Sequence, residues 1–361
     1  MAMSSNHSII TISYTELHQS SPSPSTLFAK IAQGFGNQDD CKGIIAITDI
    51  PNYPALRSKA LTLIHRLATQ TSQEVLEELE DPKSYYAVGW SHGKEKVEAD
   101  KFDLGKGSFY FNPITDDPLD AILERDFGNG KVDEEDLEEE QTTLEIPTET
   151  MARRERERTE FLSHAEGNGA FYAPNIWPDK ALPELRETAM EMGGLIRDIG
   201  KLVARQCDEY VLSQCDTDTY SSGKIQNVID NSLCCKGRLL HYFPVFVAPV
   251  EDKNDANANA NANANSNGVC ENDNQDQTVA KDVDFSDWCG WHNDHCSLTG
   301  LVPAMYFNSD GEEVSCPDPA AGLYIKSRNG ALVHVQVPSD ALAFQIGGEY
   351  CSQVVLYHTI H

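Results

Sequence analysis

The N-terminal half of the chain combines short β-like runs with long segments in which apolar residues have a helical spacing. Residues 8–14 and 43–50 are rich in β-branched and other apolar side chains and predict two strands, with a short helix between them over 26–33. Between residues 54 and 80, apolar side chains recur every three or four positions, which places them on one face of a helix. The same spacing over 183–207, after a proline suited to a first turn, predicts a second long helix.

The C-terminal part of the chain has a different pattern, in which short apolar runs follow one another. The predicted strands are 237–243, Leu301 to Phe307, Gly322 to Ser327, Ala331 to Val337, Ala341 to Ile346 and Gln353 to Ile360. Asn329-Gly330 tolerates positive φ at both turn positions, which predicts a tight hairpin there. Successive short strands after helices favour an α+β fold whose core is a double-sheet jelly roll with helices packed outside.

Composition divides the chain into three parts, which we expect to form one compact domain. Residues 1–115 are an N-terminal strand–helix region, 116–165 are an acidic charged insert, and 166–361 form the jelly-roll core. Within that core, residues 254–274 are a low-complexity segment rich in alternating Asn and Ala. Such a segment has no apolar surface to bury, so we expect a loop without chemistry.

The charge of the chain excludes several classes of partner. Asp and Glu total 57 against 28 Lys and Arg in 361 residues, which gives a formal net charge of −29. Such a surface repels phosphate backbones and anionic lipid, so we expect neither nucleic-acid nor membrane partners. The start of the chain lacks the features of a signal peptide, and the ten Cys are scattered along the chain. Reduced thiols and a cytoplasmic location are therefore expected.

The densest group of potentially reactive side chains lies within residues 287–298. Residues i and i+2 of a strand point the same way, so His292 and Asp294 would present an imidazole and a carboxylate on one side of a sheet. A second histidine from a distant strand would complete the two-histidine, one-carboxylate set that binds non-haem Fe(II) and leaves positions open for substrate and dioxygen. His358 and His361, both near the end of the last predicted strand, are the candidates.

Two other interpretations of this segment stay open on the residues alone. His292 and Asp294 could form a hydrogen-bonded pair at the surface, with no metal. The segment could instead be a zinc-binding module, although no second Cys/His knuckle follows at a customary spacing. The soft ligands for zinc would be Cys289, His292, His295 and Cys296. A rival pair with a similar spacing, His164 and Glu166, has no β pattern around it and is set aside.

Longer segments of the chain resemble a known family. Residues 288–301 are similar to the strand that carries His-x-Asp in a plant-type subgroup of the Fe(II)/2-oxoglutarate-dependent oxygenases, the isopenicillin N synthase-like superfamily. Other segments that resemble this subgroup, in the same order, are Gly89 to Gly93, Lys106 to Tyr110, Asn175 to Pro178 and Leu342 to Gly347. The resemblance covers most of the chain. It implies a double-stranded β-helix with flanking N-terminal helices, Fe(II) as the metal, 2-oxoglutarate as co-substrate, and oxidation of a small organic substrate by dioxygen.

The resemblance also implies the third metal ligand. In the family, a strand ending in a pattern like V-L-x-A-T-x-H supplies the distal histidine, and residues 355–361 match it best with His361 in that place. His358 is the rival; the odd offset means that the two cannot both face inward from a regular strand. The implied ligands are therefore His292, Asp294 and His361.

Two departures from the family pattern bear on activity. The family carries an arginine after the distal histidine that pairs with the far carboxylate of 2-oxoglutarate, and the sequence ends at His361 without it; Arg238 or Arg328 could replace it. The N-x-Y-P segment corresponds to His-Tyr-Phe-Pro, in which Phe243 replaces the co-substrate-binding tyrosine and Tyr242 is the remaining candidate contact. The alternative to an enzyme is a catalytically impaired member that acts as an interaction or regulatory protein.

Overall fold

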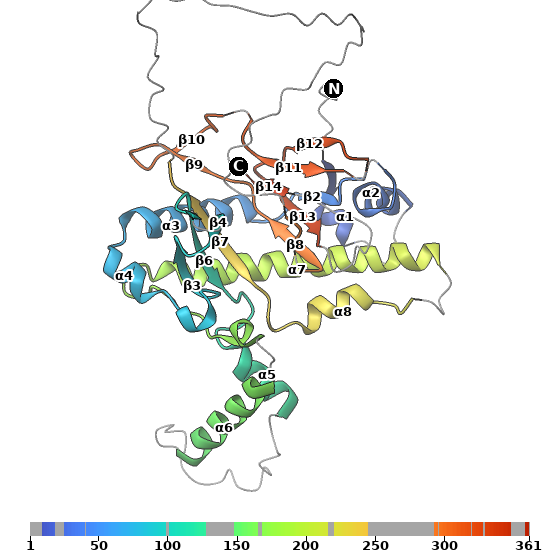
Figure 1. Cartoon of the computed structure of the whole chain (residues 1–361). Helices are drawn as coiled ribbons and strands as arrows, with labels where there is room; N and C mark the ends of the chain where they lie inside the picture. The colour runs from blue at the N-terminus through green and yellow to red at the C-terminus, as the bar shows by residue number, and fades with distance from the viewer. Residues whose placement is uncertain are drawn as a thin grey trace, which may run out of the picture.

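The computed structural model describes most of the chain outside its low-complexity and strongly acidic segments. The described residues are 9–18, 25–39, 41–98, 101–127, 148–164, 168–215, 220–244, 292–294, 296–318, 320–327, 329–347 and the backbone of 358–360. Residues 254–274 and the acidic run 133–140 lie outside them. Figure 1 shows how the helices and strands are arranged.

The longest helix, α7, extends beneath the sheets and organises the other helices (Figure 1). The α-helices are α1 (Tyr14–Leu17), α2 (Ser25–Phe35), α3 (Tyr53–Gln70), α4 (Gln73–Glu78), α5 (Pro118–Phe127), α6 (Thr148–His164), α7 (Glu184–Gln214) and α8 (Lys224–Asn231). Two acidic residues, Glu184 and Glu187, lie in the first turn of α7, where they interact favourably with the helix dipole. Among the described residues, no helix is both long and apolar enough to cross a membrane.

The strands form three larger sheets and two short hairpins. The strands are β1 (Ile10–Ser13), β2 (Ile44–Thr48), β3 (Gly89–His92), β4 (Lys96–Glu98), β5 (Lys101–Phe102), β6 (Lys106–Phe111), β7 (Gly237–Tyr242), β8 (Leu298–Leu301), β9 (Tyr306–Phe307), β10 (Glu313–Val314), β11 (Leu323–Lys326), β12 (Leu332–Val335), β13 (Leu342–Ile346) and β14 (His358–Ile360). The sheet orders are β1-β2-β13-β8, β12-β11-β14 and β3-β6-β7, with β9-β10 and β4-β5 paired separately.

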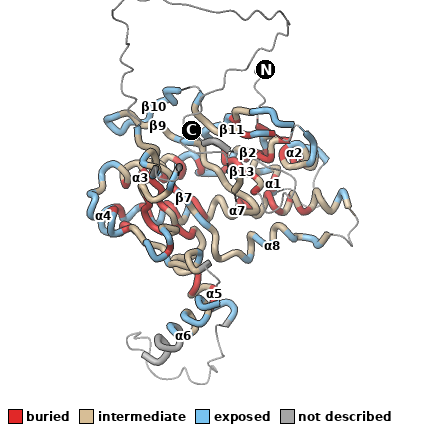
Figure 2. The backbone as a smooth tube through the Cα atoms, viewed as in Figure 1, coloured by how far each residue is buried: buried red, intermediate tan, exposed pale blue. Residues whose placement is uncertain are grey.

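The four-stranded sheet lies between a helical layer and the sheet β12-β11-β14. One face carries Ile45 and Phe344, which pack in a cluster with side chains of α2, α3 and α7. The opposite face carries Ala46 and Ala343, which pack with Ile325 of β11 and with side chains of β12. Because successive strand residues point to opposite faces, this alternation buries both sides of the sheet (Figure 2). The mixed α and β content expected from the sequence is confirmed.

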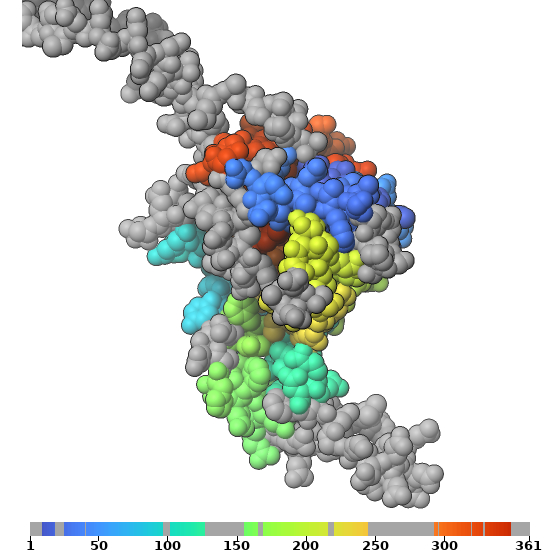
Figure 3. All heavy atoms as spheres, turned by 90° about the vertical axis from the view of Figure 1, so that its right-hand side faces the viewer, coloured from blue at the N-terminus to red at the C-terminus, as the bar shows by residue number. Residues whose placement is uncertain are grey.

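Strands from distant parts of the sequence are neighbours in these sheets. β2 pairs with β13, and β6 pairs with both β3 and β7. The sheet β3-β6-β7 packs on α3, α4 and α7 through a separate cluster that contains Trp90, Phe109 and Leu239. Figure 3 shows the N-terminal segments, in blue, beside α7, in yellow-green, with C-terminal segments in orange and red next to them. The two ends of the described chain therefore stabilise one another.

Helices α5 and α6 project from the sheets as an arm (Figures 1 and 2). Arg158 of α6 forms ion pairs with Asp117, at 2.9 Å, and with Asp120 of α5, at 2.5 Å. Ion pairs of this kind at a partly exposed surface contribute about 0–1 kcal/mol each. They orient the arm but add little to the stability of the protein.

Two N-terminal predictions are wrong in their boundaries for local reasons. The strand expected over 8–14 ends at Ser13, because Ser13 and Glu16 form a capping box that begins α1. The Ser-x-x-Glu spacing was a readable signal for this. The single helix expected over 54–80 is two helices, because Thr71 and Ser72 adopt extended backbone angles between α3 and α4. Thr and Ser favour such positions over a helix interior.

The strand expected from Leu301 to Phe307 is also wrong. β8 ends at Leu301, and the separate short strand β9 begins at Tyr306. Pro303 cannot donate a ladder hydrogen bond, and the buried Arg57 of α3 donates to the carbonyl oxygens of Pro303 and Ala304 at 2.9 and 2.5 Å. The hairpin expected at Asn329-Gly330 is confirmed, with β11 and β12 antiparallel on either side.

Candidate metal centre

His292 and Asp294 lie in a segment without regular secondary structure that precedes β8. The sequence prediction placed them within a strand, and this is wrong, because β8 begins only at Leu298. Their side chains nevertheless point the same way, with Nε2 of His292 and Oδ1 of Asp294 3.5 Å apart. The exposed fractions of the two side chains are 43% and 25%, so an ion from solvent can reach both. The described structure therefore brings together this predicted pair.

The start of β8 is held in place by a close approach of β13. The last ladder pair joins Ile346 to Leu298, and the main-chain N–H of Gly347 donates to the carbonyl oxygen of Ser297 at 3.2 Å. A Cβ at position 347 would lie 1.7 Å from the carbonyl oxygen of Cys296. Only glycine allows this contact, so Gly347 determines how near the His292–Asp294 segment comes to the sheet.

The Asp294 carboxylate is fixed by a hydroxyl of β8. Oγ1 of Thr299 donates a hydrogen bond to Oδ2 of Asp294 at 2.6 Å. Sγ of Cys296 lies 3.0 Å from the same hydroxyl oxygen. Oδ1 of Asp294 is the oxygen that faces His292. The two carboxylate oxygens thus have different neighbours.

Thr299 and Gln345 place this carboxylate beside the space between the two sheets. Thr299 is the direct ladder partner of Gln345 on β13, so both side chains project from the same face. Gln345 is two residues from Ala343 on β13, so the two side chains point to the same face of the sheet. Ala343 packs toward β11 and β12. Gln345 is 1% exposed, and neither atom of its amide has a hydrogen-bond partner in the described part of the structure. A buried amide without partners costs free energy, which suits a position where a ligand supplies them.

The third metal ligand expected from the sequence is His361, with His358 as its rival. The backbone of His358 begins β14, where it pairs with Ile325 of β11 in the facing sheet. The side chain of His358 and all of His361 lie outside the described residues, as do Cys289 and His295 of the zinc interpretation. Within the described ranges, no group of three potential ligands is found. An imidazole and a carboxylate are donors of the types that a non-haem Fe(II) site uses, so the residues present fit the metal.

Tyr242 and Arg238, two of the three candidates for co-substrate contacts, both lie on β7. Tyr242 is half-buried and pairs with Lys106. Nη2 of Arg238 lies 3.1 Å from Oε1 of Glu95 and 2.8 Å from Oγ of Ser108. Burial raises the pKa of Glu95, but Arg238 and Lys106 outweigh it and hold this pKa below its usual range. Arg238 is therefore engaged in an ion pair, and Arg328 lies outside the described residues.

A second imidazole cluster was not anticipated from the sequence. His65 of α3 and His241 of β7 have ring centroids 5.4 Å apart, and His92 lies on β3, in the same row of the sheet as His241. The ring of Phe307 stacks on His65, and the ring of Phe243 meets His241 edge to face. Three histidines from separate elements have no common spacing, so only the tertiary structure reveals them. Burial, with smaller contributions from His65 and His92, lowers the pKa of His241 to about 4.

This shift predicts that His241 makes stability depend on pH. In the unfolded chain the ring titrates near its ordinary pKa of about 6.5. Below that pH the unfolded chain binds a proton that the folded protein refuses until about pH 4. Stability from His241 is therefore present above pH 6.5 and is lost between pH 6.5 and 4. After a discount for partial solvent exposure, we expect a loss of about 1–2 kcal/mol.

Urea unfolding at pH 7 and pH 4.5 checks this expectation. The His241→Phe variant should lose less free energy of unfolding between these two values than the unmodified protein does. His18, which is exposed at the end of α1, supplies the control variant His18→Gln. Identical pH dependence of the protein and of His241→Phe would contradict the assignment.

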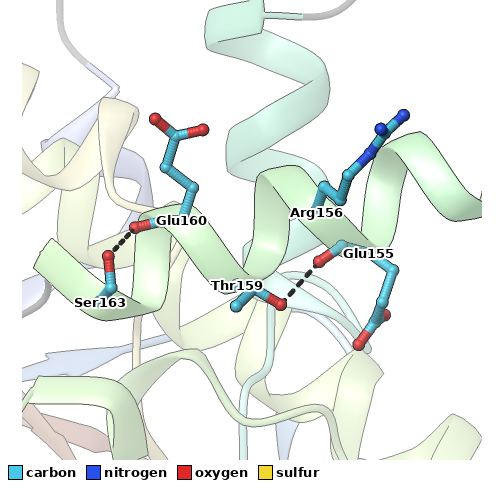
Figure 4. Close-up of a pocket in the computed structure, with 5 residues that line it drawn as sticks. All are labelled: Glu155, Arg156, Thr159, Glu160 and Ser163. Carbon is cyan, nitrogen blue, oxygen red and sulfur yellow. Dashed lines mark hydrogen bonds between the residues drawn. The ribbon is translucent and has the colours of Figure 1, made fainter.

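One surface hollow lies elsewhere, along α6 (Figure 4). Its lining residues all come from this one helix: Glu155, Arg156, Thr159, Glu160 and Ser163. The two hydroxyls donate to carbonyl oxygens of the same helix, Thr159 to Glu155 at 2.8 Å and Ser163 to Glu160 at 2.7 Å. Both hydroxyls are therefore bonded within the helix, and all five lining residues are exposed.

Comparison with known proteins was made for sequence and for structure. No protein-family model and no curated protein matches the chain. Among solved structures, the chain is similar to a 2OG-Fe(II) oxygenase family protein from Caulobacter crescentus, at 14% identity over 98% of this chain and 80% of that one, with a TM-score of 0.52. It is also similar to full-length T7H of Neurospora crassa in complex with alpha-KG, at 16% identity over 98% and 78%, with a TM-score of 0.51. Together with the His292–Asp294 geometry, these matches lead to one conclusion: the chain has the fold of the 2OG-Fe(II) oxygenases.

Proposed function

We propose that the protein is a non-haem Fe(II)- and 2-oxoglutarate-dependent dioxygenase that oxidises a small organic substrate. The observation that carries the proposal is the 3.5 Å approach of His292 Nε2 to Asp294 Oδ1 at the edge of this fold. Two neutral or anionic donors at such a distance suit adjacent positions on one metal ion. Two T7H structures of the same fold contain alpha-KG, and one of these two also contains thymine.

In this proposal each residue has a defined task. His292, Asp294 and His361, with His358 as the rival to the last, hold Fe(II) between the sheets of a closed jelly roll. When bound there, Fe(II) would activate dioxygen, and 2-oxoglutarate and the substrate would each supply two of its four electrons, which gives succinate, carbon dioxide and the hydroxylated substrate. The amide of Gln345 donates to an oxygen of a bound ligand, and Tyr242 is a further candidate contact. Residues 1–115, 116–165 and 166–361 act as one cytoplasmic domain.

The experiment is a test of metal and co-substrate dependence. The purified chain, freed of metal, is supplied with Fe(II), ascorbate and 2-oxoglutarate, and succinate is measured with and without a chelator. We expect succinate only when Fe(II) and 2-oxoglutarate are both present. Metal content measured on the protein as purified, before its metal is removed, separates the alternatives. Tightly held zinc without turnover would support a zinc-binding module, and no metal at all would support an interaction protein; either result would overturn the proposal.

A further inference from the structure

We infer that Thr299 is a positioning residue, which orients the Asp294 carboxylate for the metal through a hydrogen-bond relay that begins at Cys296. The inference rests on the proposed metal centre and adds to it a residue outside the ligand set. It assigns a role to the hydroxyl of Thr299, which neither coordinates the metal nor meets the substrate.

The direction of the relay follows from the chemistry of its members. An ionised carboxylate only accepts hydrogen bonds, so at 2.6 Å the single proton of the Thr299 hydroxyl belongs to Oδ2 of Asp294. The hydroxyl oxygen can then only accept from Cys296, whose Sγ lies 3.0 Å away. The order is therefore Cys296 S–H to Thr299 O–H to Asp294. A hydroxyl that accepts one hydrogen bond becomes a stronger donor in the next.

The relay makes the two oxygens of Asp294 unequal. Oδ2 is held by Thr299, while Oδ1 faces Nε2 of His292 at 3.5 Å. Rotation of the carboxylate about its Cβ–Cγ bond would break the bond to Thr299. The hydroxyl thus favours the orientation in which Oδ1 and Nε2 are presented together. Partners of this kind, one step outside the ligands, typically change metal affinity by about 10–100-fold.

The backbone around Thr299 is suited to this task. Thr299 lies opposite Gln345 in the β8–β13 ladder. Phe344, which precedes Gln345 on β13, is 1% exposed. The central hydroxyl of the relay is therefore anchored on a packed sheet, and it reaches Asp294 in the segment that precedes β8. A hydroxyl on a rigid strand can fix a neighbouring loop, whereas one on a loop would move with it.

The test compares metal affinity across matched variants. Co(II) is titrated into the metal-free protein, and the visible d–d absorption band reports both the dissociation constant and the ligand geometry. Thr299→Val keeps the shape of the side chain and removes the hydroxyl, and we expect about 10–100-fold weaker Co(II) binding with an altered band. Thr299→Ser keeps the hydroxyl and should restore affinity. Cys296→Ala removes only the first donor and should cost less than about tenfold.

A control separates this role from a general effect on folding. Thr69→Val makes the same change in α3, where the hydroxyl donates to the carbonyl oxygen of His65, and it should leave Co(II) affinity unchanged. Melting temperatures from circular dichroism show whether each variant is folded. If the unmodified protein binds Co(II) and Thr299→Val binds it equally well, or Thr299→Ser fails to rescue, only the role of Thr299 is overturned. If the unmodified protein binds no Co(II), the proposed metal centre fails as well.

Discussion

Replacing Asp294 by alanine is expected to abolish succinate formation that depends on Fe(II). Asp294 supplies the one carboxylate of the proposed ligand set and lies within 3.5 Å of His292. Removing one partner of a close charged interaction costs about 3–5 kcal/mol. At about 1.4 kcal/mol per tenfold, metal affinity should fall roughly 150- to 4,000-fold. Co(II) titration and succinate release, measured on the same preparation, check this expectation.

The control for this variant is another acidic residue near the C-terminal strands. Asp310 is exposed in the turn between β9 and β10, and Asp310→Ala should bind metal as the unmodified protein does. The same titration distinguishes the two candidates for the third ligand. His361→Ala should weaken binding as strongly as Asp294→Ala, and His358→Ala should not. Full activity of Asp294→Ala would show that this carboxylate does not hold the metal.

Replacing Phe344 by alanine is expected to destabilise the protein by about 3–5 kcal/mol. The ring is 1% exposed and lies on β13, between β2 and β8 in the four-stranded sheet. It fills the space left by two glycines, since a Cβ at Gly200 or at Gly300 would lie 3.3 or 3.4 Å from its Cε1 atom. Removing the ring leaves a cavity between β13 and α7 that rigid backbone cannot close.

Urea unfolding followed by circular dichroism measures this loss. Native proteins are stable by only about 5–15 kcal/mol, so the variant should unfold at a clearly lower urea concentration. The matched control is Leu332→Ala on β12, where the side chain is 45% exposed and its removal should change stability by less than about 0.5 kcal/mol. Equal midpoints for Phe344→Ala and Leu332→Ala would show that the ring is not part of the core.

The sequence predicted a helix or strand well when the interactions that form it lie within its own segment. β2 and the start of α7 were predicted close to their true positions, because their buried faces follow from apolar periodicity within the segment. The expected end of α7 at residue 207 was wrong, because the helix continues to Gln214. The hairpin at Asn329-Gly330 was predictable because Gly330 takes φ 80° in a tight turn. The strand expected over 301–307 was wrong for two reasons: Pro303 cannot donate a ladder hydrogen bond, which was a local signal, and Arg57, far away in the sequence, binds the carbonyl oxygens of Pro303 and Ala304.

The candidate site shows the same division. The His-x-Asp spacing alone indicated that His292 and Asp294 would point the same way, because alternation along an extended backbone is a property of the local chain. Family resemblance indicated the fold, and the solved structures of that fold agree with it. The spacing of residues could not show that Thr299 donates a hydrogen bond to Asp294, or that Thr299 lies opposite Gln345. The contact with Gln345 exists only because β8 pairs with β13.

By itself, then, the sequence determined the approximate positions of those helices and strands whose apolar pattern is local, and which residues could bind a metal. These properties depend on residue type and on periodicities of two to four positions. The tertiary structure alone decided which strands are neighbours, that Gly347 brings β13 against the carbonyl of Cys296, and that His65 and His241 share a buried cluster. Such contacts depend on how sheets and helices pack against one another, and packing joins residues that the linear pattern leaves far apart.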